Sequence, residues 1–296
     1  MPVVADRQGS LVRSRASKDP IVSHYTVLQH FYERVFGGTN IHFPLWFPKT
    51  KNTAEGAQNS NRLLAEASKL RSGLRVLDAG CGLGGSSFWV AERYEVKVVA
   101  ISLVEANIRR CRQLAVEQGL EHSVHFQVSD FMLAPFRPDS FDVVWNLESF
   151  IYALPKDNYL RNTYRILKPG GIWACLDGFA GPQFNVDSKA RARLSQANDG
   201  FVLTAEHWQS VSQLQVLLQQ TGFRNLRWRD LTSEVLRTPR WRYVSALAVS
   251  LLDLRTIAPH FCRQWLKSFL AGYHIFRLME SKAIVYGLVT GEKTLA

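Results

Sequence analysis

The residues of this chain that are best suited to chemistry lie in a glycine-rich segment, Val76–Gly85, with the sequence VLDAGCGLGG. Its glycines allow the backbone to turn sharply and to approach a ligand closely. The segment follows a β-type run and precedes a helical one, so that N–H groups at the helix start would point toward the ligand. Asp78 stands two residues before the first glycine, where its carboxylate would repel a pyrophosphate and attract a cationic group. The spacing therefore favours a ligand with a positively charged end.

The glycine-rich segment resembles the first motif of class I S-adenosylmethionine-dependent methyltransferases. This resemblance implies that S-adenosylmethionine is the cofactor and that its cationic amino-acid end meets Asp78, directly or through water. It also implies that the cofactor lies against Gly80, Cys81, Gly82 and Gly84. Further motifs resemble those of the tocopherol and sarcosine/dimethylglycine methyltransferases, a group that acts on small molecules. The resemblance extends roughly from Tyr25 to Leu176.

Two segments after later strands resemble the family's ribose and adenine contacts. In ISLVE, Ser102 matches the serine of the family's ISxxQ pattern, and Glu105 stands where glutamine is usual. No acid ends this strand, so these two residues are the expected substitutes for the usual ribose ligand. In VSDFM, Asp130 is expected to accept a hydrogen bond from the adenine amino group, and Phe131 or Met132 to pack on the ring. Glu105 could equally be a solvated helix residue, and an Asp in a loop is often a turn former.

The candidates for catalysis follow the fourth expected strand, in the sequence NLESFIYAL. The family pattern keeps a Glu-Ser pair here, which Glu148 and Ser149 match, but its usual histidine falls on Tyr152. Asn146 is expected close to the sulfonium end of the cofactor, and Glu148 to orient the cofactor or the acceptor. Tyr152 could hydrogen-bond an acceptor, although a tyrosine is a poor base at neutral pH.

The N-terminal segment HYTVLQHFYERVFGGTNIHFPLW also resembles the start of these enzymes. By that match, Tyr25 would reach the cofactor carboxylate, and His42 and Trp46 would line the site. A lone histidine is equally well explained as a structural residue. The candidates for proton transfer are His42, Tyr152, Asp177 and His207, of which His207 is expected mainly to pack or to cap a helix that begins near Glu206.

The elements that position these residues follow from the alternation of short β-type runs with helical stretches. Alternation of this kind predicts parallel strands joined by crossover helices. Together with the resemblance, it predicts an α/β, Rossmann-like, seven-stranded and mostly parallel sheet with helices on both faces. The expected strands are Leu74–Leu77, Val96–Ile101, Val124–Val128, Phe141–Asn146, Gly171–Leu176, Phe223–Leu231 and Ala283–Thr290.

Helices outside the sheet are expected at both ends of the chain. Pro20–Phe36 is expected to be a helix that ends at a Gly-Gly pair. Tyr243–Leu254 and His260–Arg277 are expected to form a helical cap inserted before the last strand. The expected organisation is a disordered start (1–20) and one domain (21–296), made of an N-terminal helical lid (21–70), the core (71–232), the cap (233–281) and the final strand with its tail (282–296).

Composition restricts the classes of function. Apolar residues make up 46% of the chain, which excludes global disorder. The sequence shows no apolar run near the ~20 residues of a membrane-spanning helix, and no apolar core of a secretory signal. The four cysteines have no CxxC spacing, which argues against a zinc site or a disulfide framework. We therefore expect a cytoplasmic protein without a metal site.

The basic charge leaves several partners open. The formal net charge is +11, and residues 224–282 contain 11 Lys or Arg against 4 Asp or Glu, which gives +7 of it. This excess could attract a phosphorylated acceptor, a membrane surface or a nucleic acid, or it could be a solvated face. No motif of a base-modifying enzyme follows the fourth strand, so no nucleic-acid partner is expected.

The predicted function is in-line methyl transfer from S-adenosylmethionine to a small lipophilic acceptor, aromatic or prenylated, with or without a phosphate. Alignment of the reacting groups can supply ~7–11 kcal/mol of the barrier reduction. An RNA-modifying methyltransferase and a catalytically impaired cofactor binder remain as alternatives. A nicotinamide oxidoreductase would need an acid near Ala100–Ser102, where this sequence has none. Transfer to oxygen, nitrogen or carbon and the oligomeric state stay open.

Overall fold

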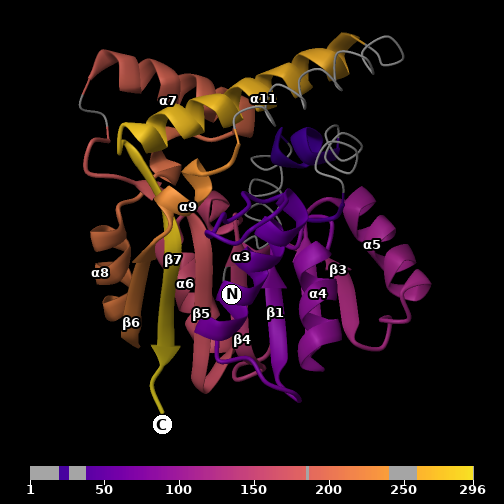
Figure 1. Cartoon of the computed structure of the whole chain (residues 1–296). Coiled ribbons are helices and arrows are strands. Elements are labelled where there is room, and N and C mark those ends of the chain that lie inside the picture. Colours follow the sequence, from indigo (N-terminus) through magenta and orange to yellow (C-terminus); the bar gives the residue numbers. More distant parts are fainter. Residues whose placement is uncertain (1–19, 27–37, 185–186, 240–258, 296) are drawn as a thin grey trace, which may run out of the picture.

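A seven-stranded sheet organises the computed structural model, which describes residues 20–26, 38–184, 187–239 and 259–295 (Figure 1). The strand order is β3-β2-β1-β4-β5-β7-β6. Strands β1 to β5 pair in parallel, whereas β7 pairs antiparallel with both β5 and β6. The predicted mostly parallel sheet is therefore confirmed. Its strands are β1 (Arg75–Ala79), β2 (Lys97–Ser102), β3 (Val124–Val128), β4 (Phe141–Leu147), β5 (Leu167–Ala180), β6 (Phe223–Asp230) and β7 (Ile284–Lys293).

The strand ends differ from the predicted ends where polar or small residues continue the pairing. Strand β1 runs two residues beyond Leu77, because Asp78 still pairs with Ala100 of β2. Strand β5 is longer at both ends, since Leu167 pairs with Phe141 of β4 and the pairing with the antiparallel β7 continues as far as Ala180. These extensions matter because the residues at the carboxyl ends of the strands belong to the candidate site.

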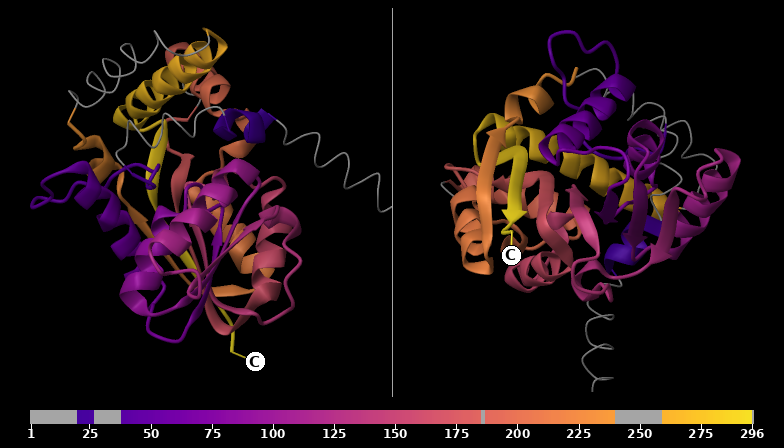
Figure 2. Two further views of the ribbon diagram at one scale, coloured as in Figure 1. Left: turned by 90° about the vertical axis from the view of Figure 1, so that its right-hand side faces the viewer. Right: turned by 90° about the horizontal axis from the view of Figure 1, so that it is seen from below.

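Helices cover both faces of the sheet, as predicted (Figure 2). The core on one face includes Leu64 of α3, Phe88 of α4 and Ile108 of α5, and the core on the other includes Leu160 of α6 and Leu214 of α8. Each helix buries an apolar side against the sheet, which is the usual construction of a doubly wound fold. These helices are α3 (Thr53–Ala67), α4 (Gly85–Tyr94), α5 (Glu105–Glu117), α6 (Lys156–Ile166) and α8 (Val211–Thr221), and the short turns are η1 (Phe131–Leu133), η2 (Phe150–Tyr152) and η3 (Ala205–His207).

A layer of helices lies across the carboxyl ends of the parallel strands (Figure 1). It contains α7 (Ser188–Phe201), α9 (Thr232–Leu236) and α11 (Pro259–Glu280). Helices α7 and α11 pack so closely that a Cβ on Gly200 would overlap the Cβ of Ala271. The predicted helix His260–Arg277 is confirmed as α11, but α7 was not predicted. The cap is therefore built from two separate parts of the chain.

Some expectations fall wholly or partly outside the described residues. The expected helix Tyr243–Leu254 and nearly all of the expected disordered start lie outside them. Of Pro20–Phe36, residues 20–26 are described and are helical. The prediction that His207 caps a helix near Glu206 is confirmed, because the short helix η3 begins at Ala205 and the Nδ1 of His207 accepts from Thr204 N at its start. Among the described helices, none combines the length and apolarity that a membrane span requires.

Candidate cofactor and acceptor site

The turn between β1 and α4 depends on its glycines. Gly80, Gly82 and Gly84 have φ angles of 105°, 53° and 79°, a region that side chains other than glycine adopt only with strain. The N–H groups of Gly80 and Cys81 both donate to the carbonyl oxygen of Ile101, at 3.0 Å each, which fixes the turn on the end of β2. A Cβ on Gly80 would overlap the side chain of Ser149. The turn thus packs directly against the loop after β4.

Residues 39–41 lie against the same turn. A Cβ on Gly82 would lie 3.2 Å from Cδ1 of Ile41, and a Cβ on Gly85 would lie 2.8 Å from the side chain of Asn40. Asn40 is held in turn by the amide of Asn61 on α3, at 3.5 Å. The glycine turn and the segment over it therefore form a cradle that side chains at these positions would fill.

Asp78 is a buried carboxylate just before the cradle. It is 3% exposed, and its Oδ2 accepts a hydrogen bond of 2.5 Å from the hydroxyl of Ser87 on α4. Burial raises the pKa of Asp78 to about 6, because a charge in an apolar environment is costly. A cationic ligand group would offset this cost. The acidic group and the open backbone together fit the amino-acid end of S-adenosylmethionine.

The predicted ribose and adenine residues are brought to the neighbouring strand ends. Ser102 ends β2 and its hydroxyl accepts from Val104 N at 3.2 Å, while Glu105 begins α5 as an exposed residue. Asp130 follows β3 and accepts from Met132 N at 2.9 Å, which caps η1. Phe131 packs edge-on against Tyr159, with ring centroids 5.3 Å apart. Ser102 and Asp130 therefore each have a local backbone role as well as the predicted one.

Asn146 lies deeper than the sequence suggests. It is fully buried, and its Nδ2 donates to the carbonyl oxygen of Ala79 at 3.1 Å and to Ser149 Oγ at 2.9 Å. Its Oδ1 accepts from the hydroxyl of Tyr159 at 2.6 Å and from the indole of Trp173 at 2.8 Å. These four hydrogen bonds use both of its donors and both acceptor positions of its oxygen. Asn146 thus ties the end of β1 to the loop after β4.

Glu148 connects three distant segments. Its Oε1 accepts from the backbone N–H of Phe43 at 2.6 Å and from the hydroxyl of Tyr286 on β7 at 2.8 Å. Its backbone has a φ of +53°, and its N–H donates to Leu176 O of β5 at 2.9 Å. Burial raises the pKa of Glu148 to about 8, although both hydrogen bonds to Oε1 act in the opposite direction. Tyr286 was missed by the sequence analysis.

Tyr25 and Tyr152 contact each other. The two hydroxyl oxygens are 3.0 Å apart, and the hydroxyl of Tyr152 donates to the carbonyl oxygen of Phe201, at the end of α7, at 2.9 Å. Tyr25 therefore donates to Tyr152. Burial and the neighbouring Tyr152 raise the pKa of Tyr25 well above its usual value. The pair joins residues 20–26 to η2 and α7.

Two buried histidines lie near the start of the described chain. His42 Nδ1 is 3.3 Å from the carbonyl oxygen of Phe43, His42 Nε2 is 3.4 Å from Asn40 Oδ1, and burial lowers the pKa of His42 to about 4. His24 was not singled out by the sequence. Its Nδ1 lies 2.9 Å from the amide nitrogen of Gln264 on α11, while its buried Nε2 has no hydrogen-bond partner among the described residues.

Asp177 and Lys156 both form hydrogen bonds with the backbone of the loop after β4. Asp177 accepts from Ile151 N at 2.9 Å and from Gly178 N at 2.8 Å, and burial raises its pKa to about 6. The buried ammonium of Lys156 donates to the carbonyl oxygens of Phe150, Ile151 and Ala153 at 3.2–3.3 Å. Burial also lowers the pKa of Lys156 to about 8. Lys156 was missed, because a lysine at a helix start normally suggests a surface residue.

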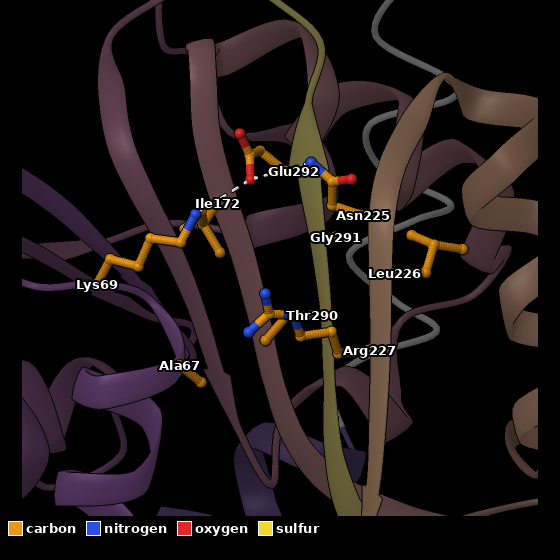
Figure 3. Close-up of a pocket in the computed structure, with 9 residues that line it drawn as sticks. All are labelled: Ala67, Lys69, Ile172, Asn225, Leu226, Arg227, Thr290, Gly291 and Glu292. Carbon is orange, nitrogen blue, oxygen red and sulfur yellow. Dashed lines mark hydrogen bonds and ion pairs between the residues drawn. The ribbon is translucent and has the colours of Figure 1, made fainter.

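A groove with a volume of about 180 Å³ lies apart from these residues, between the end of α3 and strands β5, β6 and β7 (Figure 3). An ion pair of 3.3 Å joins Lys69 and Glu292 at this groove. None of the predicted site residues lines it. They lie on the glycine turn, at the ends of neighbouring strands, and in the N-terminal segment that contacts Tyr152 and Glu148.

The arginines from position 224 onward, which the charge pattern suggested for a phosphate, do not lie together at the candidate site. Arg224 and Arg227 lie on β6, the edge strand separated from β1 by three strands, and Arg227 lines the groove of Figure 3. Arg229 stacks over Phe47 at 5.9 Å, and Arg237 donates to Trp46 O at 3.4 Å. Trp46 is itself tied to α9 through Glu234 O. Arg240 and Arg242 lie outside the described residues.

Sequence comparisons agree with this geometry. Residues 76–171 match a family model described as a methyltransferase domain. The sarcosine/dimethylglycine N-methyltransferase of Halorhodospira halochloris is 32% identical over 149 residues, which cover 50% of this chain and 53% of the relative. The chloroplastic tocopherol O-methyltransferase of Arabidopsis thaliana is 27% identical over 228 residues, 75% of this chain and 63% of the relative. The chain spans between 35% and 63% of the length of three such relatives.

Solved structures share the fold. The [4+2]-cyclase SpnF superposes with a TM-score of 0.75 at 22% identity, covering 92% of this chain and 94% of that chain. Geranyl diphosphate methyltransferase in complex with GPP and sinefungin superposes with a TM-score of 0.72 at 18% identity, covering 94% of this chain and all of that chain. The predicted resemblance is confirmed: residues 76–171 match a methyltransferase domain, and the relatives of the chain include sarcosine/dimethylglycine and tocopherol methyltransferases.

Proposed function

We propose that the protein transfers the methyl group of S-adenosylmethionine to a small lipophilic acceptor. The observation that carries this proposal is the buried carboxylate of Asp78 beside a turn whose three glycines have positive φ angles. A buried carboxylate without a cationic partner is costly, and the amino group of the cofactor provides that partner. The methyltransferase domain at residues 76–171 supports the same cofactor.

In this proposal the cofactor lies along the carboxyl ends of β1, β2 and β3. The backbone of Gly80, Cys81, Gly82 and Gly84 approaches its amino-acid end. Ser102 and Glu105 bind the ribose, while Asp130 and Phe131 bind the adenine. Asn146 acts through Ala79 and Ser149, because its own hydrogen bonds are already used within the protein.

S-adenosylmethionine supplies a methyl group activated on a sulfonium, so that in-line transfer needs alignment more than a nucleophile from the protein. The chain's residues contribute by closing the site. Glu148 fastens the segment around Phe43 to β7, and Tyr25 fastens residues 20–26 to η2. Closure on both sides excludes water from the reacting groups.

Where the methyl-accepting molecule must lose a proton, Glu148 is the residue proposed to take it up. Its pKa of about 8 lies close to neutral pH, which is the range that suits general acid–base chemistry. His42 has a pKa of about 4 and is a weak base. Asp177 and Tyr152 are less suitable, because they are engaged within the protein. Both oxygens of Asp177 accept backbone hydrogen bonds, and the hydroxyl of Tyr152 donates a hydrogen bond to Phe201 O.

The proposed acceptor is lipophilic because the surroundings of Glu148 are aromatic. Phe43 packs edge-on against Phe276 of α11 and against Tyr286, with ring centroids 5.5 Å and 5.9 Å apart. Aromatic faces suit a flat or prenyl-like molecule and stabilise cationic character that develops on it. Relatives named for sterol, tocopherol and geranyl diphosphate support this class of acceptor.

Three finer features belong to the same proposal. The acceptor carries a phosphate, which the structural neighbour named for geranyl diphosphate supports, although the described arginines of residues 224–237 do not gather at the candidate site. The protein acts in a biosynthetic reaction in the cytoplasm, as the cysteine pattern suggests. It contacts a membrane surface peripherally, from which a lipophilic acceptor would be taken up.

The first test is a calorimetric titration with S-adenosylhomocysteine. We expect micromolar binding by the native chain and a loss of at least about tenfold in Asp78→Asn, since one such interaction is worth about 1.4 kcal/mol or more. The matched control is Asp142→Asn, because Asp142 is also a strand aspartate but pairs with Lys168 away from the turn. Equal binding by both variants and the native chain would contradict the proposed site.

A second candidate is a protein that binds the cofactor but performs other chemistry. Tyr152 occupies the position where the resembling enzymes have a histidine, and its hydroxyl is engaged with Tyr25 and Phe201. A [4+2]-cyclase shares the fold, so the fold alone does not imply methyl transfer. Labelled S-adenosylmethionine offered with mixed lipophilic acceptors separates the two functions. Tight binding without any transfer of label would favour this candidate.

A further inference from the structure

The outer side of α11 carries large apolar side chains. Leu266, Leu270 and Tyr273 are exposed by 45%, 45% and 49%, and their spacing of four and three residues places them on one side of the helix. The opposite side buries Ala271 and Ile275 against the rest of the protein. Helix α11 is therefore apolar on two sides, of which only one is covered by the described part of the chain.

A single exposed leucine requires no explanation, because much of any protein surface is apolar. Three large apolar side chains in a row are different, since they form one continuous stripe that water covers at a cost. Such a stripe on a helix at the outside of a domain is typical of a surface that meets a partner.

Basic residues lie on the two helices of this layer. Lys267 is exposed on α11 itself, and Lys189 and Arg191 are exposed on α7, which packs beside α11 at the top of the molecule (Figure 1). Lys267 forms an ion pair of 2.9 Å with Asp199, which holds its side chain at the junction of the two helices. An apolar helix side flanked by Lys and Arg, with an aromatic residue in the stripe, is the pattern of helices that lie in a lipid–water interface.

We propose that the outer side of α7 and α11 docks on an anionic lipid surface. Leu266, Leu270 and Tyr273 enter the boundary between headgroups and acyl chains, and Lys189, Arg191 and Lys267 lie at the level of the lipid phosphates. The net charge of +11 favours this occupant over a second copy of the chain, which would bring like charges together. The inference extends the proposed function, because the docked layer covers the site that would receive a lipophilic acceptor.

The test is flotation of the full chain with vesicles of phosphatidylcholine mixed with phosphatidylglycerol, and with vesicles of phosphatidylcholine alone. We expect binding to the mixed vesicles, weakening with salt, and at least about a tenfold loss in the combined variant Leu266→Gln, Leu270→Gln and Tyr273→Gln, since each buried CH₂ contributes about 0.8 kcal/mol. The matched control replaces Val116, Val216 and Leu295 with Gln, because they are also exposed but lie on α5, on α8 and after β7. We expect the control to bind as the native chain does.

Two further measurements make the result decisive. Lys189→Gln combined with Arg191→Gln should reduce the preference for anionic over neutral vesicles and leave the remaining apolar binding in place. Titration with S-adenosylhomocysteine should be unchanged in all these variants, which shows that they are folded and separates this inference from the proposed function. Equal flotation of the stripe variant and its control would overturn the proposal. So would a dimer, seen by sedimentation, that the stripe variant abolishes.

Discussion

The hydroxyl of Tyr286 donates a hydrogen bond of 2.8 Å to the carboxylate of Glu148, and so joins the last strand of the sheet to the loop that follows β4. The same carboxylate oxygen accepts from Phe43 N, which belongs to the segment beside the glycine turn. One half-buried acid therefore holds both sides of the proposed site together. Its protonation state should affect stability as well as catalysis.

The stability of the unliganded protein should fall as pH rises through the range in which Glu148 ionises. Its pKa is raised from about 4.5 in the unfolded chain to about 8 in the folded one, so the folded state binds the proton more tightly. Its stabilising effect is complete below pH ~4.5 and lost above pH ~8. Glu148→Gln cannot ionise and should become more stable than the native chain at pH ~9, by up to about 5 kcal/mol, because the two pKa values differ by about 3.5 and one pKa unit is worth about 1.4 kcal/mol.

Urea unfolding of both proteins at acidic and alkaline pH measures this difference. Tyr286→Phe serves as the companion variant. It removes a hydrogen bond that lowers the pKa of folded Glu148, so its loss of stability should begin at the same pH but continue to a higher pH than in the native chain. A Glu148→Gln variant whose stability relative to the native chain does not change with pH would contradict the assignment.

Binding of S-adenosylhomocysteine should weaken as the pH falls below about 6. Burial raises the pKa of Asp78 to about 6, so that below this pH the carboxyl is protonated and loses its attraction for an ammonium group. The expected decrease is up to about tenfold per pH unit, since one proton is exchanged. Calorimetry across the range tests it, and Asp78→Asn should bind weakly at every pH without this dependence. The same slope in Asp78→Asn would assign the titration to another group.

The sheet could be predicted because its strands are short apolar runs separated by helical segments. Each parallel strand is covered on both faces, so the required side chains are continuous and visible in the sequence. The glycine turn was equally visible, since Gly80 and Gly84 are needed for the backbone itself. Both features depend on residues close together in the chain, which is why the sequence alone was sufficient.

Helix α7 was missed because it buries small side chains. Its sequence, SKARARLSQANDGF, contains few large apolar residues, and its buried residues are Ala190, Leu194, Ala197 and Gly200. Their spacing of four, three and three residues is helical, but small residues carry a weak periodic signal. Their role became apparent only with α11, against which Gly200 packs.

Contacts between distant segments could not be predicted either. Tyr286 lies 138 residues from Glu148, and Gln264 lies 240 residues from His24. No local pattern announces such a pair, because each residue alone suits a strand or a helix. Asn146 could not be placed fully from the sequence either: the hydrogen bonds of its side chain to Ala79 O and to the indole of Trp173 join segments far apart in the chain.

Gly80→Ala should destabilise the protein by more than the backbone conformation alone requires. At a φ of 105° a side chain is strained by about 1 kcal/mol or more, and its Cβ would also overlap Ser149. Gly73→Ala is the matched control, because Gly73 has a φ of 82° but no atom within 4 Å of the added Cβ. The difference between the two variants in free energy of unfolding should be about 1–3 kcal/mol, the usual cost of overpacking.

Equal destabilisation by Gly80→Ala and Gly73→Ala would contradict this prediction. It would show that the loop after β4 moves away from the added Cβ at little cost in free energy. Binding of S-adenosylhomocysteine distinguishes the variants further. Gly80→Ala should lose it, because the displaced turn no longer presents Asp78 and the cradle together, whereas Gly73→Ala should keep it.

Lys156→Met should destabilise the protein strongly although it replaces a charged residue by an apolar one of similar length. The ammonium group of Lys156 donates to three carbonyl oxygens of the loop after β4, and Met leaves them without this donor. Each unsatisfied buried group costs about 1–3 kcal/mol, so the free energy of unfolding should fall by about 3 kcal/mol.

The matched control Lys168→Met removes a lysine whose side chain is 43% exposed and pairs with Asp142. Exposed ion pairs contribute about 0–1 kcal/mol, so the control should differ little from the native chain in urea unfolding. If both variants lost the same small amount, water would have to replace the ammonium of Lys156, and the loop that carries Tyr152 would not depend on it.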